Sequence, residues 1–311
     1  MHKDQVMRRF SLILMLILVQ SIVQASEKMS QKLELTQVSD KVWAIVGPLG
    51  NRTAVNFGNN ASFGFVVTTK GVVLIDSGGS LKGAQEIDKL IKSVTSQRVK
   101  FVINTGGQDH RWLGNDYFKR QGAKIITSKK ALKDQHKRFN TQLAQLRYLI
   151  GEENIRGTLE QYADISFEDK YKFSIDNVAF ELYFEGGAHT KGDIFVWLPQ
   201  EKIIFAGDIV YMERLLSINV HSNSEKWVHS FEALSRLQPK KIIPGHGKPT
   251  TLAQATKETY DYLLNLRNQV EKLDDISEIN KIDQSRFSHL YNYELLKGKN
   301  AQRVFTEMEW E

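Results

Sequence analysis

The chain has 311 residues, of which 41% are apolar and 25% charged, and 42 Lys and Arg against 36 Asp and Glu give a formal charge of +6. This composition is typical of a globular protein with one or two domains, and it excludes a low-complexity chain. The basic residues are scattered without interleaved aromatic residues, which excludes nucleic acid as a partner. The chain has no cysteine, so any metal must be held by His, Asp or Glu.

The first 25 residues have the pattern of a signal peptide. Three basic residues (Lys3, Arg8, Arg9) precede an apolar run at 10–19, and small residues lead to a cleavage site after Ala25. We therefore predict a periplasmic or secreted protein with no stable membrane insertion after cleavage. The alternative is an uncleaved membrane anchor, but an apolar run this short is less typical of a membrane-spanning segment than of a signal peptide.

The first half of the remaining chain alternates predicted strands and helices. Apolar spacing and turn residues define most of them, and Ser128 is the expected N-cap of the longest helix. The predicted elements are a strand (33–46), a Gly- and Asn-rich loop (47–60), a hairpin (62–68 and 71–75), a helix (81–96), a strand (99–103), a helix start (113–121), a strand (123–127) and a long helix (128–150). The loop at 47–60 is either simple turn chemistry or a substrate-facing segment.

The second half repeats this pattern after a mixed connection at 151–169, which is either a lid or a surface loop. Its predicted elements are strands (178–184, 193–198 and 202–206), a helix (224–237) with Ser224 as cap, a strand (241–243) and a largely helical segment from 252 onward. Both halves of the chain thus show strand hairpins followed by a helix. This repeated pattern predicts two sheets packed face to face with helices outside. We expect a globular domain over 26–275 and a C-terminal helical extension over 276–311.

Polar residues with metal-ligand or acid–base chemistry follow several of these strands. Each alone is more often a structural residue than a ligand, but all of them stand in loops that such a layout brings to one edge. They are Asp76, Asp109, His110, His189, Asp208 and His246. The other five histidines, at positions 2, 136, 221, 229 and 289, match no motif and are taken as non-functional.

Four short motifs in order resemble the metallo-β-lactamase superfamily. They read L-I-D-S-G (74–78), G-G-A-H-T-K-G-D (186–193), F-A-G-D (205–208) and P-G-H-G (244–247), and the resemblance covers roughly residues 38–250. It implies a metallo-hydrolase fold, the αββα sandwich, in which two sheets lie between helices. It also implies a metal site at one edge of the sandwich.

The family's T-H-x-H-x-D-H motif is degenerate here, where residues 104–115 read N-T-G-G-Q-D-H-R-W-L-G-N. Aligned without a gap, Gly106 and Gln108 replace the two leading histidines, His110 replaces the Asp and Arg111 the last His. One inserted residue near Arg111 restores the pair Asp109–His110 instead. Neither register supplies the leading histidines.

This departure changes the metal sites that the resemblance implies. The family's first site uses the two absent histidines with His189 and a bridging Asp208, so we predict it to be empty or weak. The second site retains four candidate ligands, Asp109, His110, Asp208 and His246. We therefore predict one Zn²⁺ ion, with Mn²⁺ or Fe²⁺ also compatible.

A single ion would still support hydrolysis, because it lowers the pKa of a bound water toward roughly 7. The resemblance then makes Asp109 the residue that orients this water, and His189 a hydrogen-bond partner for a substrate oxygen or leaving group. Asp76 is expected to tie down a loop or a histidine N–H. Arg111 would either hold an anionic substrate group or point to solvent.

Three hypotheses for function follow. The leading one is an exported metal-dependent hydrolase that cleaves an ester, thioester, lactone or amide in a small-molecule substrate. The second is a non-catalytic binding or accessory protein with a degenerate metal site on the same scaffold. The third is a metal-free enzyme with His110 and Asp208 as base and acid, which gives no reason for His189 and His246 to occupy ligand positions.

Overall fold

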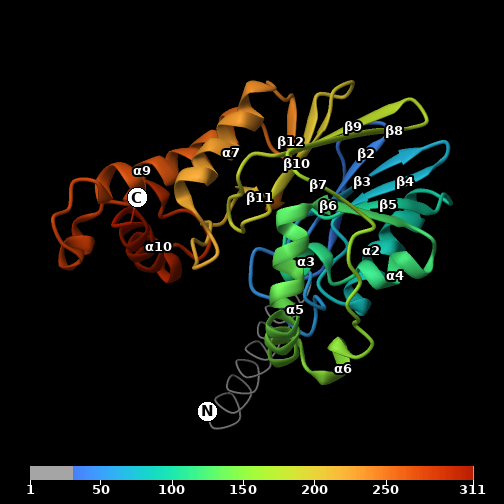
Figure 1. The fold of residues 1–311 in the computed structure, drawn as a ribbon, viewed down its shortest axis with the longest axis horizontal. Helices are drawn as coiled ribbons and strands as arrows, with labels where there is room; N and C mark the ends of the chain where they lie inside the picture. Colours follow the sequence, from blue (N-terminus) through green and yellow to red (C-terminus); the bar gives the residue numbers. More distant parts are fainter. Residues whose placement is uncertain (1–30, 311) are drawn as a thin grey trace, which may run out of the picture.

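The computed structural model describes residues 31–310 and consists of two β-sheets packed face to face between layers of helices (Figure 1). The predicted signal peptide lies outside these residues. Within the described part of the chain, no helix is both long and apolar enough to cross a bilayer. The αββα sandwich expected from the sequence is confirmed.

The first sheet is built from the N-terminal half of the chain, in the order β1-β2-β3-β4-β5-β6-β7. Its strands are β1 (Glu34–Gln37), β2 (Val42–Val46), β3 (Phe63–Thr68), β4 (Gly71–Ile75), β5 (Val99–Ile103), β6 (Lys124–Ser128) and β7 (Ile165–Phe167). The strands from β1 to β4 pair antiparallel, whereas those from β4 to β7 pair parallel. The parallel strands β4 and β5 therefore end at the same edge of the sheet.

The second sheet follows in the order β12-β11-β10-β9-β8. Its strands are β8 (Lys170–Ile175), β9 (Val178–Phe184), β10 (Ile194–Leu198), β11 (Ile203–Tyr211) and β12 (Lys241–His246). The pair β11–β12 is parallel, with register shifts after Phe205 and Gly207. These irregularities lie at the end of β11 that carries Asp208, as bulges near functional sites often do.

The core between the sheets is apolar on both faces. Val66 of the first sheet and Leu182 and Phe205 of the second lie in one buried cluster, and each such side chain contributes about 1.5–3 kcal/mol on burial. Gly64 explains the close approach of the sheets, because a Cβ there would lie 2.4 Å from Cε1 of Phe205. A larger residue at 64 would push the sheets apart.

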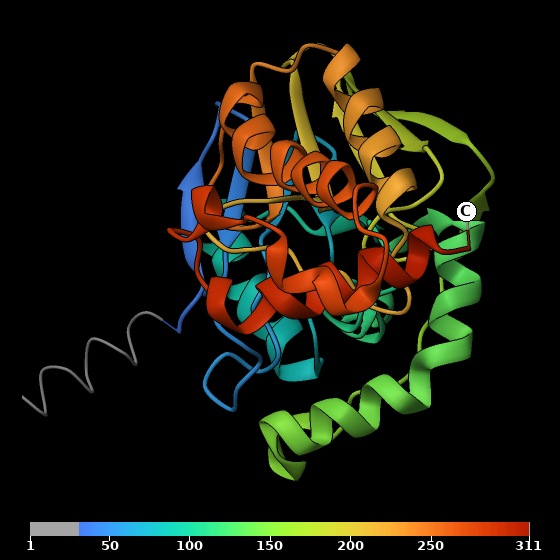
Figure 2. The same ribbon diagram turned by 90° about the vertical axis from the view of Figure 1, so that its left-hand side faces the viewer.

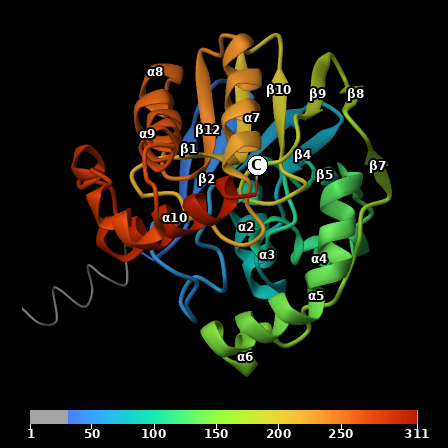
Figure 3. The same cartoon turned by 60° about the vertical axis from the view of Figure 1, so that its left-hand side comes forward.

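Helices cover the outer faces of both sheets (Figures 1 and 3). On the first sheet lie α2 (Leu81–Val94) and α4 (Asn115–Arg120), and on the second lie α7 (Ser224–Arg236), α9 (Asp261–Val270) and α10 (Tyr293–Met308). The remaining helical elements are α3 (Asp109–Trp112), α5 (Lys129–Ile150), α6 (Glu152–Ile155), α8 (Leu252–Ala255), a π-helical turn (Thr256–Tyr260) and two 3₁₀ turns (Ile276–Lys281 and Ser285–Phe287). The helix α10 lies within the predicted C-terminal extension.

Several local predictions were wrong, among them the loop positions of Asp109 and His110, which lie in α3, and of His246, which ends β12. The expected strand over 33–46 is a hairpin of β1 and β2, because the chain turns back between Val38 and Val42. The N-cap of α7 is Asn223, whose side chain accepts from the backbone N–H of Lys226. Asp208 lies inside β11 rather than in a loop after it.

The buried face of α5 also differs from the expected apolar stripe. Leu146 and Ile150 are buried as predicted, but the N-terminal half buries Asp134, Gln135 and Arg138. These polar side chains contact the loop that follows β5, so this part of α5 supports the candidate site.

Candidate metal centre

The loop after β5 is fixed by side-chain amides and by Asp76. Asn104 and Asn115 exchange hydrogen bonds of 2.8 and 2.9 Å between their side chains. Asp76, which ends β4 with a left-handed φ of 66°, accepts from the backbone N–H and the hydroxyl of Thr105, both at 2.7 Å. Strained backbone of this kind often marks a functional site, and here the Asp76 carboxylate accepts hydrogen bonds from Thr105 in the loop and from Arg111 in α3. Asp76 thus ties down a loop, as predicted.

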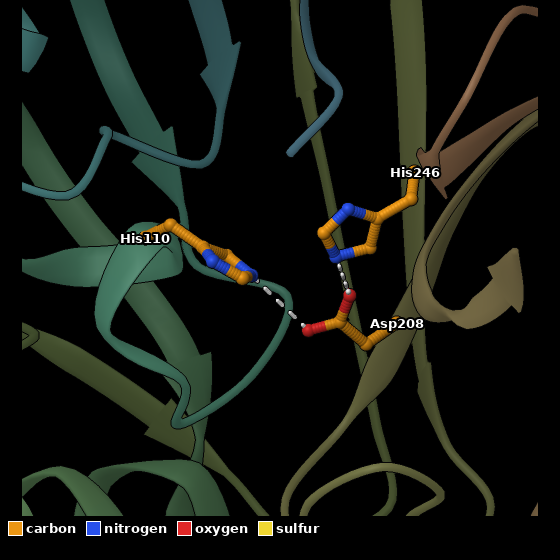
Figure 4. A group of neighbouring side chains, drawn as sticks. All are labelled: His110, Asp208 and His246. Carbon is orange, nitrogen blue, oxygen red and sulfur yellow. Dashed lines mark hydrogen bonds and ion pairs between the residues drawn. The ribbon is translucent and has the colours of Figure 1, made fainter. Parts of the chain in front are cut away.

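His110, Asp208 and His246 come together at the sandwich edge from α3, β11 and β12 (Figure 4). One ligand atom from each lies within 4.8 Å of the others. The Nε2 atoms of His110 and His246 lie 3.4 and 3.3 Å from separate oxygens of the Asp208 carboxylate. All three side chains are buried, so the three residues form a compact His–Asp–His group at the expected edge.

The ring of His246 is oriented as a metal ligand. Its Nδ1 lies 2.9 Å from the carbonyl oxygen of Asn60 and 3.4 Å from Nη1 of Arg214; the contact with the carbonyl is the shorter one, and because a carbonyl only accepts, this nitrogen carries the proton. In the neutral ring Nε2 then presents a lone pair to the Asp208 carboxylate. Two acceptors that face each other at 3.3 Å call for a cation between them. Burial, with Arg214 nearby, holds the pKa of His246 well below its usual range, so a proton is not that cation.

The ring of His110 has the opposite arrangement. Nη2 of Arg52 lies 2.9 Å from Nδ1, and because a guanidinium only donates, this nitrogen accepts. The proton is therefore on Nε2, directed at Asp208. Burial and the nearby Arg111 lower the pKa of His110 to about 4, so the ring is neutral. A cation bound by Nε2 requires the other tautomer, and Arg52 must then leave Nδ1.

Asp109 holds Arg52 in this position. Its carboxylate accepts from Nε of Arg52 at 3.1 Å and forms an ion pair with Nη2 of the same side chain. Burial alone would raise the pKa of Asp109, but the charges of Arg52 and His110 and the hydrogen bonds that both residues donate together lower the pKa. Asp109 therefore does not belong to the His–Asp–His group, although it adjoins His110.

Arg111 is fully buried and links two carboxylates. Its Nη1 donates to Asp76 at 2.9 Å and its Nη2 to Asp208 at 2.6 Å, and the same two nitrogens donate to the carbonyls of Ser62 and Gly245, each at 2.9 Å. Both predicted roles of Arg111 are wrong, since it neither reaches solvent nor has a free face for a substrate. Burial would raise the pKa of Asp208, but Arg111 holds it well below its usual range.

His189 is also separate from the group. Its Nδ1 lies 2.9 Å from the carbonyl of Ser217, and its ring packs against Tyr211 and Trp227. Since Nδ1 donates to the carbonyl, Nε2 presents a lone pair, and it has no hydrogen-bond partner among residues 31–310. Burial lowers the pKa of His189, which keeps the ring neutral.

The positions of the two absent histidines are filled by other contacts. A Cβ on Gly106 would lie 2.2 Å from Oδ1 of Asp193, so no larger side chain fits there without rearrangement. The carbonyl of Gly106 accepts from Gln135, and that of Gly107 accepts from Arg138, both on α5. The polar face of α5 thus packs where the family motif would supply ligands.

Arg52 and Arg214 were missed by the sequence reasoning. Arg52 stands in the loop at 47–60, where Gly and Asn indicate only turns, and it contacts residues more than fifty positions away. Arg214 has its Nη1 atom 3.4 Å from Nδ1 of His246. Nothing local to either residue indicates these contacts.

The structure places two sheets between helices and a His–Asp–His group at one edge. This combination is typical of metal-dependent hydrolases with an αββα fold. A sequence profile of the metallo-beta-lactamase superfamily matches residues 57–246, and the chain belongs to this superfamily. Proteins of this superfamily include hydrolases, and the family typically binds zinc.

Curated relatives and solved structures agree with this assignment. The chain is 27% identical to a metallo-beta-lactamase type 2 of Bacillus sp. (strain 170), over 73% of this chain and 84% of that protein. It is 25% identical to one of Bacteroides fragilis, over 80% and 94%. A metallo-beta-lactamase from Pontibacter korlensis superimposes with a TM-score of 0.59 at 26% identity, covering 75% of this chain and 99% of that one. The DIM-1 metallo-beta-lactamase, 19% identical with a TM-score of 0.58, supports the fold alone.

Proposed function

We propose that the protein is a hydrolase with a single divalent cation, Zn²⁺ in the first place, held by His110, Asp208 and His246. The observation that carries this proposal is the unshared lone pair of His246 Nε2 facing the Asp208 carboxylate at 3.3 Å. Three protein ligands with an open position are the usual set of a catalytic zinc site. Mn²⁺ and Fe²⁺ are compatible with the same donors.

When bound, the cation supplies Lewis-acid chemistry and makes water a nucleophile near neutral pH. The protein's own residues prepare the site for it. Arg111 keeps Asp208 ionised and fixed, and the carbonyl of Asn60 sets the tautomer of His246. His189 offers a neutral Nε2 that can accept a proton or a hydrogen bond from a reacting group. In this proposal Asp109 positions Arg52 and is not a metal ligand.

The substrate class follows from the family and from the charges around the group. An ester, thioester, lactone or amide is the bond to be cleaved, and the names of the relatives make a β-lactam amide the first one to test. Arg52 and Arg214 each contact one histidine of the group. The charge of Arg52 is paired with Asp109, whereas Arg214 has no ion pair with a carboxylate of residues 31–310, and this cation beside the site favours a substrate that carries a negative charge.

The experiment combines metal analysis with a substrate panel. Purified protein is reconstituted with zinc, its metal content is measured, and it is assayed on a chromogenic cephalosporin, an aryl ester, a thioester and a lactone. We expect one zinc per chain and hydrolysis of at least one substrate. Both zinc binding and hydrolysis should be lost in His246→Ala. His229→Ala is the matched control, because His229 is exposed and lies beside Glu185, which is not a residue of the group. Zinc below about a tenth of an equivalent in the unaltered protein would refute the proposal.

A non-catalytic binding or accessory protein is the second candidate. Its support is the absence of the two leading family histidines from residues 104–115, with Asp193 occupying the space at Gly106. One bound zinc without turnover of any panel substrate would favour it over the hydrolase. For either function we propose export, which rests on the predicted signal peptide and is tested by cell fractionation.

A further inference from the structure

A strongly basic depression lies outside the His–Asp–His group. It has a volume of about 490 Å³ and lies where the starts of α5 and α7 meet the C-terminal half of α10 (Figure 2). Among residues 31–310, four cationic side chains line it and no carboxylate does. They are Lys130 of α5, Lys191 of the loop before β10, Lys226 of α7 and Arg303 of α10.

These four cations have no ion-pair partner within the described part of the chain, although the Glu168 carboxylate interacts with Lys130 at longer range. None of them forms an ion pair with a carboxylate of residues 31–310, although many other Lys and Arg side chains in that range do. A second depression, of about 560 Å³, is lined by Lys32 and Lys248 but also by Glu34 and Glu213, so its charges balance. The unbalanced charge therefore distinguishes the first depression.

The backbone and side chains around the four cations are ordered by internal contacts. Nε of Arg303 donates to the carbonyl of Asn219 at 3.1 Å, which directs the rest of the guanidinium fork. The stem of Lys226 covers Gly186, where a Cβ would meet it at 3.7 Å. Since Gly186 has a φ of +102°, a glycine is favoured at this place in the lining.

Two helices also begin at this depression. Both α5 and α7 direct their N-terminal ends toward it, and each end carries a partial positive charge from the helix dipole. The helix ends add to the field of the four side chains and are not the basis of the site. Lys130 and Lys226 occupy the first turns of α5 and α7, and the first turn of α7 also holds Glu225, which is not among the residues that line the depression.

We propose that this depression binds a small organic anion that carries phosphate groups. A fixed guanidinium fork matches phosphate oxygens in a bidentate geometry, and lysines add point charges around it. Four cationic side chains in one pocket favour an anion that carries more than one negative charge. The volume of about 490 Å³ lies in the range of small-molecule sites and exceeds what a single inorganic ion needs.

The site joins the C-terminal extension to the conserved fold. Arg303 lies beyond residue 246, where the superfamily match ends, whereas Lys191 and Lys226 lie within the matched segment. The extension thus completes a pocket that the matched segment alone would leave open. Ala188 and Thr190, on either side of His189, also line the pocket, so its ligand would contact the loop that carries His189.

The test is calorimetric titration of metal-free protein with inorganic pyrophosphate at low salt. We expect one saturable site, and the double variant Lys226→Gln, Arg303→Gln should bind about tenfold more weakly or worse, because it loses two charge-assisted contacts. The matched control is Lys257→Gln, Lys299→Gln, which removes the same charge from two exposed lysines that have no ion pair with a carboxylate of residues 31–310. It should bind within about twofold of the unaltered protein.

Absence of saturable binding to the unaltered protein would overturn the proposal, and so would an equal loss in the control variant. If the first variant does not fold, Lys130→Gln, Lys191→Gln takes its place with the same expected loss. Because the protein is metal-free throughout, the result is independent of whether the metal-centre proposal holds.

Discussion

Replacing Arg111 by methionine removes the cation that joins Asp76 to Asp208. The guanidinium is fully buried and donates to both carboxylates and to two carbonyl oxygens. Methionine preserves most of the stem volume, so the change tests charge and hydrogen bonds rather than packing. The variant leaves two carboxylates, each about 1% exposed, without their shared partner.

Removing one partner of a buried ion pair typically costs about 3–5 kcal/mol, because the other charge stays buried and unpaired. Here two carboxylates lose the same partner, which would double the cost if both stayed ionised. Burial already raises the pKa of Asp76 to about 6 with Arg111 present, so without Arg111 this carboxyl takes up a proton near neutral pH. We therefore expect a loss of about 4 kcal/mol at pH 7.

The assay is urea unfolding of metal-free protein at pH 7 and pH 5. In the variant, burial without Arg111 raises the folded-state pKa of both carboxyls above the unfolded value. Above the raised pKa both carboxyls are ionised and the variant is fully destabilised. As the pH falls through this pKa they become protonated, so the loss of unfolding free energy should be smaller at pH 5. Arg147→Met is the control, since the ion pair of Arg147 with Glu152 is exposed. This variant should lower the free energy of unfolding by less than about 0.5 kcal/mol. A loss below about 1 kcal/mol at pH 7, or one unchanged at pH 5, would refute this account of Arg111.

Three further predictions concern the surroundings of the metal centre. Arg52→Gln should raise zinc affinity about tenfold in competition titrations, because the charged donor no longer occupies Nδ1 of His110; unchanged or weaker affinity would contradict this. The pKa of His110 is about 4 in the folded protein against 6.5 normally, so the folded state binds fewer protons between these values. As the pH drops from about 6.5 to about 4, the metal-free unaltered protein should therefore lose up to about 3 kcal/mol more stability than a His110→Asn variant, a comparison that cancels the opposite contribution of Asp76, whose pKa is raised to about 6; identical urea-unfolding profiles of the two proteins would count against it. Gly106→Ala should lower stability by about 1–3 kcal/mol, since its Cβ meets Asp193 at 2.2 Å. Gly298→Ala, in open space on α10, should raise stability by about 0.5–1 kcal/mol, and equal effects of the two changes in thermal unfolding would contradict the packing argument.

Most of the fold could be predicted because local patterns in the sequence determine most of its helices and strands. The strand Val99–Ile103 has the predicted bounds, and the hairpin of β3 and β4 agrees to within one residue. The cap at Ser128 is also confirmed, since its hydroxyl accepts from the backbone N–H of Ala131. Errors arose where a short turn interrupts an apolar pattern, as between β1 and β2.

The site could be predicted only in part, for a physical reason. Strand ends show that His110, Asp208 and His246 gather at one edge, but they do not show which partner each side chain takes. Asp109 turns to Arg52, which stands in a loop whose composition indicates only turns. Arg111 looked like a surface residue because its two carboxylate partners lie far away in the chain. Contacts of this kind are set by the assembled sheets, so no local pattern carries them.

The most direct measurement is an anomalous difference map at the zinc edge from crystals of the mature protein grown with zinc. The account predicts one strong peak between Nε2 of His110, Nε2 of His246 and the carboxylate of Asp208, with Arg52 displaced from His110. No peak at that position, or one whose ligands include Asp109 or His189 in place of these atoms, would contradict it.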